Sequence, residues 1–145
     1  MKNLKIKKLN DKAIIPTYGT KSSAGADLYA MIDSLIEIKP NESIIIPTGI
    51  AMDIPEDYVG LIYARSSLAT KKGLAPANKV GVIDADYRGE IKVVLYNHSN
   101  QIQTISPNER IAQIVITPFV QVQFLVVDEL DETERGTGGF GSTNK

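Results

Sequence analysis

Two aspartates, Asp84 and Asp86, stand two residues apart in a segment whose composition suits general-base catalysis. The segment opens with an apolar run at residues 81–83, passes through the acidic pair and closes with Gly89, a pattern typical of a β-hairpin. The two carboxylates are therefore expected on one face, where an aspartate beside apolar residues can take a proton from a water molecule. A plain turn, which also favours Asp and Gly, is the alternative that this segment alone leaves open.

Arginine is scarce, with four residues among 16 cationic side chains, so the position of each arginine is informative. Arg65 precedes Ser66 and Ser67, where a short helix is predicted to begin. A guanidinium, two hydroxyls and free backbone amides at a helix start can together bind an anion such as phosphate. An ordinary capped helix with a surface arginine is the competing interpretation.

Asp27 and Gln113 are polar residues inside apolar stretches. An unpaired buried carboxylate is costly, so Asp27 needs a cation or backbone donors as partners, whereas Gln113 is more simply explained as a polar position on a strand face. Residues 136–141 match the spacing G-x-G-x-x-G, but a dinucleotide site needs a preceding strand and a following helix, which we do not expect here. Glycine-rich backbone beside Arg135 can still wrap phosphate oxygens, unless the segment is simply a flexible tail.

The composition limits the chemistry further. The 145 residues contain 16 Lys and Arg, 17 Asp and Glu and no cysteine, which predicts one domain, no broad positive field for nucleic acid and no thiol chemistry. His98 is the only histidine, so catalysis must rely on carboxylates, and oxygen ligands favour a hard cation such as Mg²⁺. No stretch reaches the roughly 20 apolar residues of a membrane span, and the N-terminus does not resemble a signal peptide. We therefore expect a cytoplasmic protein that binds neither membranes nor nucleic acid.

The elements that must position these residues are short Ile- and Val-rich runs separated by Gly and Pro, without sustained helical periodicity. The sequence predicts an all-β domain, such as a sandwich, jelly roll or barrel. The expected strands span residues 4–9, 26–29, 35–38, 42–47, 49–54, 58–64, 81–83, 90–97, 110–118 and 120–127. One helix is expected at residues 67–72, with Ser66 or Ser67 as its N-cap and Gly73 as its stop.

In residues 110–127 apolar side chains occur at odd and at even positions, so a strand formed here would be apolar on both faces. A strand that is apolar on both faces needs two partners, and in a small chain a second copy would supply one of them, so we expect a homo-oligomer. A central sandwich strand is the alternative. Beyond residue 127 the composition becomes acidic and then glycine-rich, which divides the chain into a β domain at 1–127 and a C-terminal arm at 128–145. The arm is expected to be mobile unless a ligand orders it.

Five segments, taken in order along the chain, resemble the five motifs of the trimeric dUTPase (deoxyuridine triphosphatase) family. They are Ala24-Gly25-Ala26-Asp27-Leu28, Arg65-Ser66-Ser67-Leu68-Ala69, Asn78 with residues 81–89, Glu109-Arg110-Ile111-Ala112-Gln113, and residues 135–142. Each motif is weak alone, but five in the right order are highly specific. The resemblance implies a jelly-roll-like, distorted β-barrel or sandwich and a homotrimer. Each of its three sites would combine motifs of neighbouring chains and be closed by the arm of a third.

The resemblance also implies an activity, the hydrolysis of dUTP to dUMP and pyrophosphate, with Asp84 as the general base for the water that attacks the α-phosphorus. It assigns Asp27 to hold Mg²⁺ through water molecules. The substrate-binding residues that it implies are Arg65, Ser66, Ser67 and Gln113 for the triphosphate, Asn78, Gly81, Ile83 and Tyr87 for the nucleoside, and Arg135, Gly138, Phe140, Gly141, Ser142 and Thr143 in the arm. Two departures, Ala64 where proline is frequent and Ser67 where glycine is common, put the affinity in question rather than the reaction.

Two other functions stay open. A dCTP deaminase of the same fold carries a similar Arg-Ser-Ser stretch, but it needs a carboxylate poised at cytosine C4, and none can be assigned here. A non-enzymatic β-sandwich binding module would explain the strands and turns, but not Asp27, Asp84, Arg65 and Arg135 together. Tyr87 and the complete arm motif favour the dUTPase interpretation.

Overall fold

Residues 3–139 are described in this computed structural model, and within them twelve strands and one short helix follow one another. The strands are β1 (Lys5–Lys8), β2 (Thr17–Tyr18), β3 (Ala26–Tyr29), β4 (Ile36–Ile38), β5 (Ser43–Pro47), β6 (Ile50–Asp53), β7 (Tyr58–Tyr63), β8 (Leu74–Pro76), β9 (Gly81–Ile83), β10 (Lys92–Asn97), β11 (Gln103–Ile105) and β12 (Arg110–Pro118). The helix α1 (Ser66–Lys72) lies between β7 and β8. The predicted all-β fold class is confirmed, although no sheet of this part of the chain closes into a barrel.

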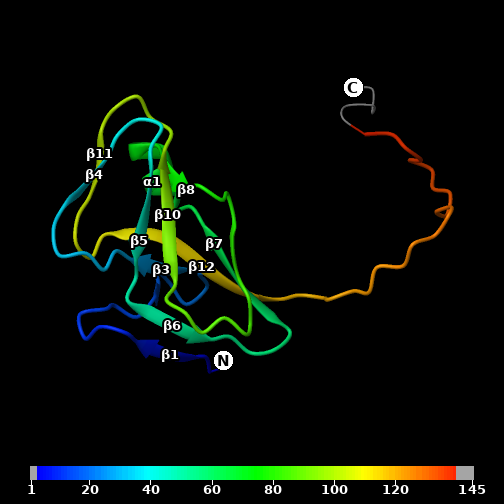
Figure 1. Cartoon of the computed structure of the whole chain (residues 1–145), viewed down its shortest axis with the longest axis horizontal. Helices are drawn as coiled ribbons and strands as arrows, with labels where there is room; N and C mark the ends of the chain where they lie inside the picture. The colour runs from blue at the N-terminus through cyan, green and yellow to red at the C-terminus, as the bar shows by residue number, and fades with distance from the viewer. Residues whose placement is uncertain (1–2, 140–145) are drawn as a thin grey trace.

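The five-stranded sheet that carries most of the candidate residues has the order β2-β3-β12-β7-β9, and its neighbouring strands are antiparallel. β12 lies at the centre, between β3 and β7 (Figure 1). Along β12 the buried Ala112 and Ile114 alternate with the half-buried Gln113 and Val115, so the two faces of the sheet differ. The face of Ala112 and Ile114 packs on the core, and the face of Gln113 and Val115 is called the outer face below.

Three smaller antiparallel sheets complete the β body, in the orders β5-β10-β8, β1-β6 and β11-β4. One continuous core joins them to the five-stranded sheet. Its largest fully buried side chains are Leu28, Ile38, Ile46, Ile50, Ile54, Leu74, Ile91, Val93, Leu95, Ile105, Ile111 and Ile114. Because burial of each such side chain contributes roughly 1.5–3 kcal/mol, this core provides the rigid base on which the outer face is built.

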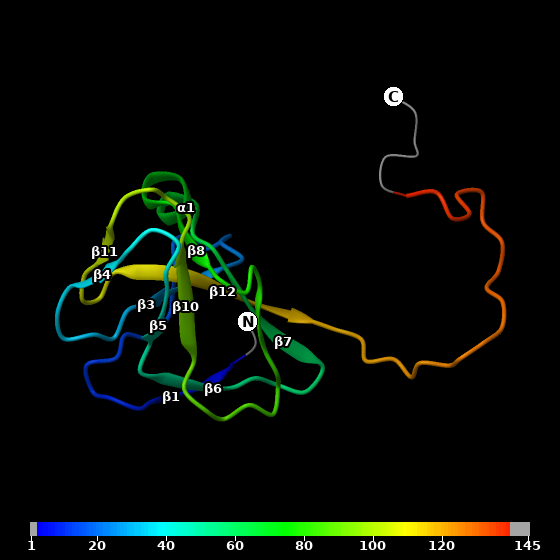
Figure 2. The same ribbon diagram turned by 45° about the horizontal axis from the view of Figure 1, so that its top comes forward.

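Every expected strand except the last is present, with bounds that agree to within two residues. The strand expected at residues 120–127 is wrong, because residues 119–139 form no strand and run away from the β body in both views (Figures 1 and 2). Val120 and Phe124 are 85% and 90% exposed. The N–H of Phe119 donates to the carbonyl oxygen of Asp57 at 3.0 Å, but no strand of the described residues pairs with the segment beyond it. The strands β2, β8 and β11, of two or three residues, were not predicted.

The helix begins one residue earlier than expected and is capped differently. Arg65 is the N-cap, with φ −84° and ψ 132°, and no side chain makes a capping hydrogen bond, so the expected Ser66 or Ser67 cap is wrong. Both serines lie inside the first turn, which leaves their hydroxyls free for other partners. Gly73 ends the helix as predicted, in a left-handed conformation with φ 64°. No helix within residues 3–139 is long and apolar enough to cross a membrane.

The hairpin expected after residue 81 is also wrong. Its first strand is present as β9, but β9 pairs with β7, whereas the following strand β10 pairs with β5 and β8 in another sheet. Residues 84–91 therefore connect two sheets. Turn-forming residues between two apolar runs indicate that the chain reverses, but they do not determine which strands then pair.

Candidate active site

The outer face of the five-stranded sheet carries a row of polar residues across three strands. The register places Gln113 of β12 opposite Asp27 of β3 and opposite Tyr63 of β7. Directly opposed residues of antiparallel strands project from the same face, so these three side chains lie side by side. They line a hollow of about 420 Å³, named here the arginine hollow. Its lining residues are Gly19, Ser23, Ala24, Gly25, Asp27, Tyr63, Arg65, Ser66, Arg110, Gln113 and Val115.

Asp27 has two guanidinium partners. Arg65 Nε donates to its Oδ1 at 2.7 Å, and Arg110 Nη1 donates to its Oδ2 at 3.1 Å. Asp27 is only 9% exposed, so the two ion pairs offset the cost of burying its charge. The prediction that Asp27 needs a partner is confirmed. Two cations share one carboxylate, which leaves the arginine hollow with an excess of positive charge suited to an anionic ligand.

Gln113 is fixed in the same hollow. Its Nε2 donates to the carbonyl oxygen of Ala64 at 2.9 Å, in the segment that joins β7 to α1. Its side chain lies against Gly25, where an added Cβ would overlap Gln113 Oε1. The glycine of the first motif thus makes room for the glutamine of the fourth, and that glutamine is tied to the residue just before Arg65.

The start of α1 joins this cluster. Ser66 lines the arginine hollow, whereas Ser67 lines an adjoining hollow of about 300 Å³ together with Arg65 and Arg110. Arg65 Nη1 lies 3.4 Å from Ser67 Oγ. The structure therefore brings together four predicted residues, Asp27, Arg65, Ser66 and Gln113, and places Ser67 beside them.

Asp84 lies in a second hollow of the outer face, of about 580 Å³, named here the aspartate hollow. Asp84 and Asp86 both line it, as their spacing predicted. The other lining residues are Val59, Leu61, Val82, Ala85, Phe119 and Gln121. A carboxylate at the edge of an apolar depression is a suitable general base for a water molecule.

Tyr87 is oriented by its own turn. Its N–H donates to the carbonyl oxygen of Asp84 at 3.2 Å, and its hydroxyl donates to the carbonyl oxygen of Glu90 at 3.0 Å. The ring crosses Gly89, where an added Cβ would overlap the Tyr87 hydroxyl. The glycine therefore permits a folded-back ring that is still 45% exposed and available for stacking.

The remaining predicted nucleoside residues surround β9. Gly81 and Ile83 are its first and last residues, paired with Ile62 and Gly60 of β7. Asn78 lies in the turn before β9, where its carbonyl oxygen accepts the N–H of Val80 at 2.7 Å. A Cβ at Gly81 would come within 3.1 Å of Asn78 Nδ2, so the asparagine side chain lies over this glycine.

The two hollows share no lining residue. Where the two hollows adjoin, the register places Val115 of the arginine hollow opposite Leu61 of the aspartate hollow, and Leu61 opposite Val82, in an apolar row across the outer face. Leu61 and Val115 are half-buried and Val82 is 59% exposed, so this row is open to solvent in a single chain. One chain therefore does not place Asp84 and the arginine cluster in a single cavity.

The two predicted arm residues that the structure describes, Arg135 and Gly138, line neither hollow. Arg135 and Gly138 lie in the exposed C-terminal segment, where Arg135 Nε donates to the carbonyl oxygen of Gly138 at 2.9 Å. This segment lies away from the β body in both views (Figures 1 and 2). The expectations for Phe140, Gly141, Ser142 and Thr143 fall outside the described residues.

Two residues of the arginine hollow, Arg110 and Tyr63, were not predicted as site residues from the sequence. Arg110 shares Asp27 with Arg65, and Tyr63 lies across from Gln113. A signal for Arg110 was present, because it is one of only four arginines and opens the strand that carries Gln113. Tyr63 had no such signal, since an aromatic residue at the end of a strand is ordinary.

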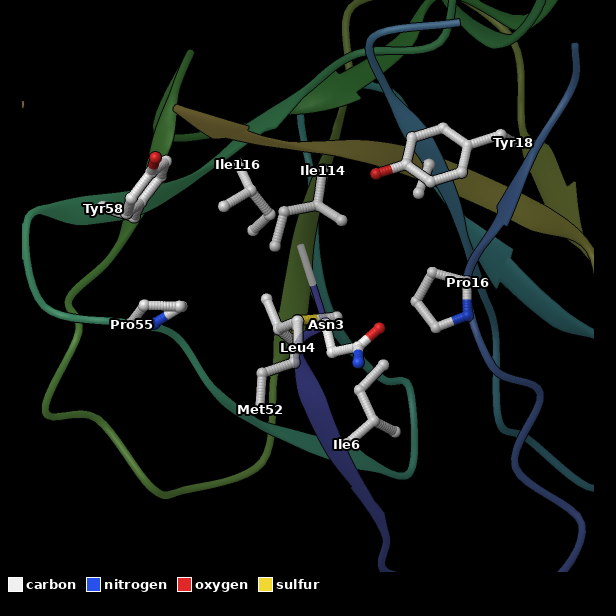
Figure 3. A pocket seen from close by; sticks show the side chains of 11 residues that line it. Asn3, Leu4, Ile6, Pro16, Tyr18, Met52, Pro55, Tyr58, Ile114 and Ile116 are labelled. Carbon is white, nitrogen blue, oxygen red and sulfur yellow. The ribbon is translucent and has the colours of Figure 1, made fainter. Parts of the chain in front are cut away.

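A third cavity, of about 370 Å³, has a different character (Figure 3). It is lined by Ile114 and Ile116 of β12, Leu4 and Ile6 at β1, and Met52 of β6, among others. Ile114 belongs to the core-facing side of β12, so this cavity is not on the outer face. Among residues 3–139 no charged side chain lines it, and such an apolar lining is unsuited to a phosphate ligand.

The described residues contain no group of three or more His, Cys, Asp or Glu side chains that could hold a metal by themselves. Both oxygens of Asp27 already accept hydrogen bonds from arginines. A cation beside Asp27 would therefore have to take its ligands from phosphate oxygens and water, which suits Mg²⁺.

Comparisons with known proteins agree with this geometry. The sequence model of the dUTPase family matches residues 11–144. A deoxyuridine 5'-triphosphate nucleotidohydrolase of Nautilia profundicola is 54% identical over 142 residues, which cover 98% of this chain and 99% of that protein.

Solved structures give the same result. A dUTPase variant of Staphylococcus bacteriophage 80alpha with dUpNHpp superposes with a TM-score of 0.88 at 29% identity, covering 100% of both chains. A variant dUTPase of Staphylococcus aureus phage phi11, described for its coordination of a structural Mg(II) ion, has a TM-score of 0.77 at 26% identity. That match covers 88% of this chain and 98% of the phage protein.

Proposed function

The chain belongs to the dUTPase family, and on this basis we propose that it hydrolyses dUTP to dUMP and pyrophosphate. The reaction is part of nucleotide metabolism: it supplies dUMP and keeps uracil out of DNA. We place it in the cytoplasm, as the sequence predicts. The observation that carries the proposal is the gathering of Asp27, Arg65, Ser66 and Gln113 in one hollow of the sheet face that also bears Asp84. Neither the dCTP deaminase nor the binding-module alternative is favoured by the family match.

The triphosphate binds in the arginine hollow. Arg65 supplies a fixed guanidinium, Ser66 and Ser67 supply hydroxyls, and Gln113 supplies its amide. Charge-assisted hydrogen bonds of this kind are short and strong, and a guanidinium fork matches phosphate geometry. The ion pair of Arg65 with Asp27 holds that fork in place before substrate arrives, which lowers the cost of ordering it on binding.

Asp84 acts as the general base. It orients a water molecule and takes its proton while the water oxygen attacks the α-phosphorus. The bond from the α-phosphorus to the α–β bridging oxygen breaks, so pyrophosphate leaves and dUMP remains. Catalysis of this reaction is mostly positioning and charge stabilisation, which agrees with a site made of one carboxylate and several cationic or polar groups.

The nucleoside binds beside β9, where its base and sugar are recognised. Asn78 and the backbone of Gly81 and Ile83 contact the uracil edge, because fixed donors and acceptors reject the reversed pattern of cytosine at a cost of about 1–3 kcal/mol for each unpaired group. Tyr87 packs on the deoxyribose and leaves no room for a ribose 2′-hydroxyl. Its folded-back ring over Gly89 supports this role.

Mg²⁺ is the cofactor that we assign to this reaction. When bound, it neutralises charge on the phosphate oxygens and helps to orient the triphosphate. Asp27 would hold it through water, since its own oxygens are engaged by Arg65 and Arg110. The positive excess of the arginine hollow supplies further neutralisation from the protein itself.

We also propose that the enzyme is a homotrimer whose sites are shared between chains. Separation of the arginine and aspartate hollows in one chain supports this, because the reaction needs both groups at one substrate. Apolar surface that the single chain leaves uncovered supports it as well. This surface includes Val82, the apolar cavity of Figure 3 and most of residues 119–127. Such surface is typical of a chain that packs on copies of itself.

The C-terminal arm, residues 128–145, closes the site of another copy in this proposal. Arg135 and Gly138 clamp the γ-phosphate together with Ser142 and Thr143, while Phe140 stacks over the uracil and Gly141 allows the close approach. Closure excludes bulk water and commits the substrate. The exposure of residues 120–137 in the single chain supports an arm that has its partners elsewhere.

The test is an incubation of the full chain with Mg²⁺ and, separately, dUTP, dCTP, dTTP and UTP, with products separated by ion-exchange chromatography. We expect conversion of dUTP alone, to dUMP and pyrophosphate in equal amounts. Formation of dUTP or dUMP from dCTP would instead identify a deaminase. Inertness towards all four nucleotides would refute the proposed function and leave the binding-module alternative.

A further inference from the structure

Arg88 lies in the turn that carries Asp84 and Tyr87, and its guanidinium bridges that turn. Arg88 Nη1 donates to the carbonyl oxygen of Ala85 at 2.6 Å and to that of Tyr87 at 3.2 Å. The turn itself is closed by the N–H of Tyr87, which donates to the carbonyl oxygen of Asp84 at 3.2 Å. The guanidinium therefore holds two carbonyls of the turn, those of Ala85 and Tyr87 on either side of Asp86, in one orientation.

The same guanidinium anchors the turn to the β body. Arg88 Nη2 donates to Asp53 Oδ1 at 2.7 Å, and Asp53 is the last residue of β6. β6 pairs with β1 along its whole length, so its end is a fixed point. Only a planar fork with several donors can reach both the carbonyls and the carboxylate, which lysine cannot reproduce.

The far end of this connection is held by different groups. Glu90 Oε1 accepts the N–H of Gly49 at 2.9 Å, and the N–H of Ile91 donates to the carbonyl oxygen of Ile50 at 2.9 Å. These bonds fix Glu90 against Gly49, in the turn between β5 and β6, and Ile91 against Ile50, the first residue of β6. Among the described contacts, the part that bears Asp84 is tied to β6 through Arg88.

We propose that Arg88 is a positioning residue for the hydrolysis, which sets the Asp84 carboxylate and the Tyr87 ring through its contacts with the turn and with Asp53. This role rests on the proposed dUTP hydrolysis. Arg88 and Asp53 side chains are 57% and 39% exposed, and ion pairs this exposed contribute little to global stability. The effect of Arg88 is therefore on geometry, where small displacements of a reacting group lower the rate strongly.

The experiment compares Arg88→Ala, Arg88→Lys and Asp53→Asn with the wild-type chain. A matched control is Lys5→Gln, which removes the other ion pair of Asp53, at 3.3 Å, without touching the turn. For Arg88→Ala we expect kcat on dUTP to fall by at least about tenfold, and the preference for dUTP over UTP to narrow. Arg88→Lys should not restore kcat, and Asp53→Asn should cause a smaller loss in the same direction. Lys5→Gln should behave as wild type.

A second measurement does not depend on activity. Amide hydrogen exchange at Tyr87 reports the bond that closes the turn, and we expect it to be faster in Arg88→Ala, with the melting temperature unchanged within about 2 °C. Unchanged exchange with kcat within twofold of wild type would overturn the positioning role. A fall in kcat that merely follows a fall in melting temperature would do the same. If the wild-type chain were inactive on dUTP, the proposed hydrolysis would be refuted. The hydrogen-exchange result would still test whether Arg88 stabilises the turn.

Discussion

The shared carboxylate of Asp27 shows how single residues decide the character of the site. A carboxylate in an apolar strand start predicts a partner, and Arg65 was already a candidate anion binder. The second partner, Arg110, lies 83 residues away in sequence, and only the pairing of β3 with β12 brings it near. Residue types thus predicted the need for a cation, whereas the number and identity of the cations depended on strand register.

Asp84 carries the most direct prediction at this scale. Asp84→Asn keeps the size and the turn-forming tendency of the side chain but removes its ability to accept the proton of water. We expect the variant to bind dUTP with near wild-type affinity and to lose turnover by about 10²–10⁴-fold. Calorimetric titration with a non-hydrolysable dUTP analogue measures binding, and single-turnover assays measure the rate.

Asp86→Asn is the matched control, because Asp86 lines the same hollow two residues away. It should retain most of the turnover. If Asp84→Asn kept its rate while Asp86→Asn lost it, the general base would be Asp86. If both variants kept their rates, neither carboxylate would act as the base.

At the scale of elements, α1 is held to the start of β12 by one half-buried ion pair. Lys72 Nζ contacts Glu109 Oε1 at 2.6 Å and donates to the carbonyl oxygen of Thr104 at 2.7 Å, so the last turn of the helix is fixed. Glu109 Oε2 also accepts the N–H of Ser106 at 2.9 Å. Arg65 directly precedes this helix and Arg110 directly follows Glu109. The ion pair therefore helps to fix the positions of the two arginines relative to each other.

The sequence predicted elements better than their connections. Alternation and turn residues predicted nine strands and the Gly73 stop, because those signals are local. The N-cap at Arg65 was missed because no side chain caps the helix. Two predictions, the hairpin after residue 81 and the strand at 120–127, were wrong for another reason. Which strands pair depends on the packing of the whole core or on a second chain, and local sequence does not encode either.

Glu109→Gln tests the tie between α1 and β12. Removing the charge leaves Lys72, whose side chain is 30% exposed, without its anion, so the free energy of unfolding should fall by about 1–3 kcal/mol. Urea denaturation at a fixed chain concentration measures this, since assembly would otherwise shift the midpoint. As a control, Asp33→Asn removes the exposed pair with Lys12 and should change stability by less than about 0.5 kcal/mol. Equal effects of the two substitutions would contradict a structural role for the Lys72–Glu109 pair.

At the scale of the whole molecule, the single chain looks incomplete in two respects. The arginine and aspartate hollows lie on one sheet face and share no lining residue, although apolar side chains of the two face each other across neighbouring strands. Residues 119–139 form no strand and residues 119–137 are exposed, although residues 119–127 are mostly apolar. Both features are explained if the hollows of different copies face each other and the C-terminal segment packs on a neighbour. The doubly apolar run predicted an oligomer and the family resemblance implied sites shared between chains, but no residue pattern by itself indicated which groups would lie apart in one chain.

Mixing two inactive variants tests this arrangement directly. Asp84→Asn chains keep an intact arginine hollow, and Arg65→Gln chains keep an intact Asp84 while retaining a donor for Asp27. If each site takes its arginine hollow from one chain and its Asp84 from another, random mixing at equal amounts restores about a quarter of the sites. Each variant alone should be inactive, and sedimentation should give a trimer for both. Absence of recovery after confirmed subunit exchange would mean that one chain supplies both groups, and the two hollows would then have to join by a movement within the chain.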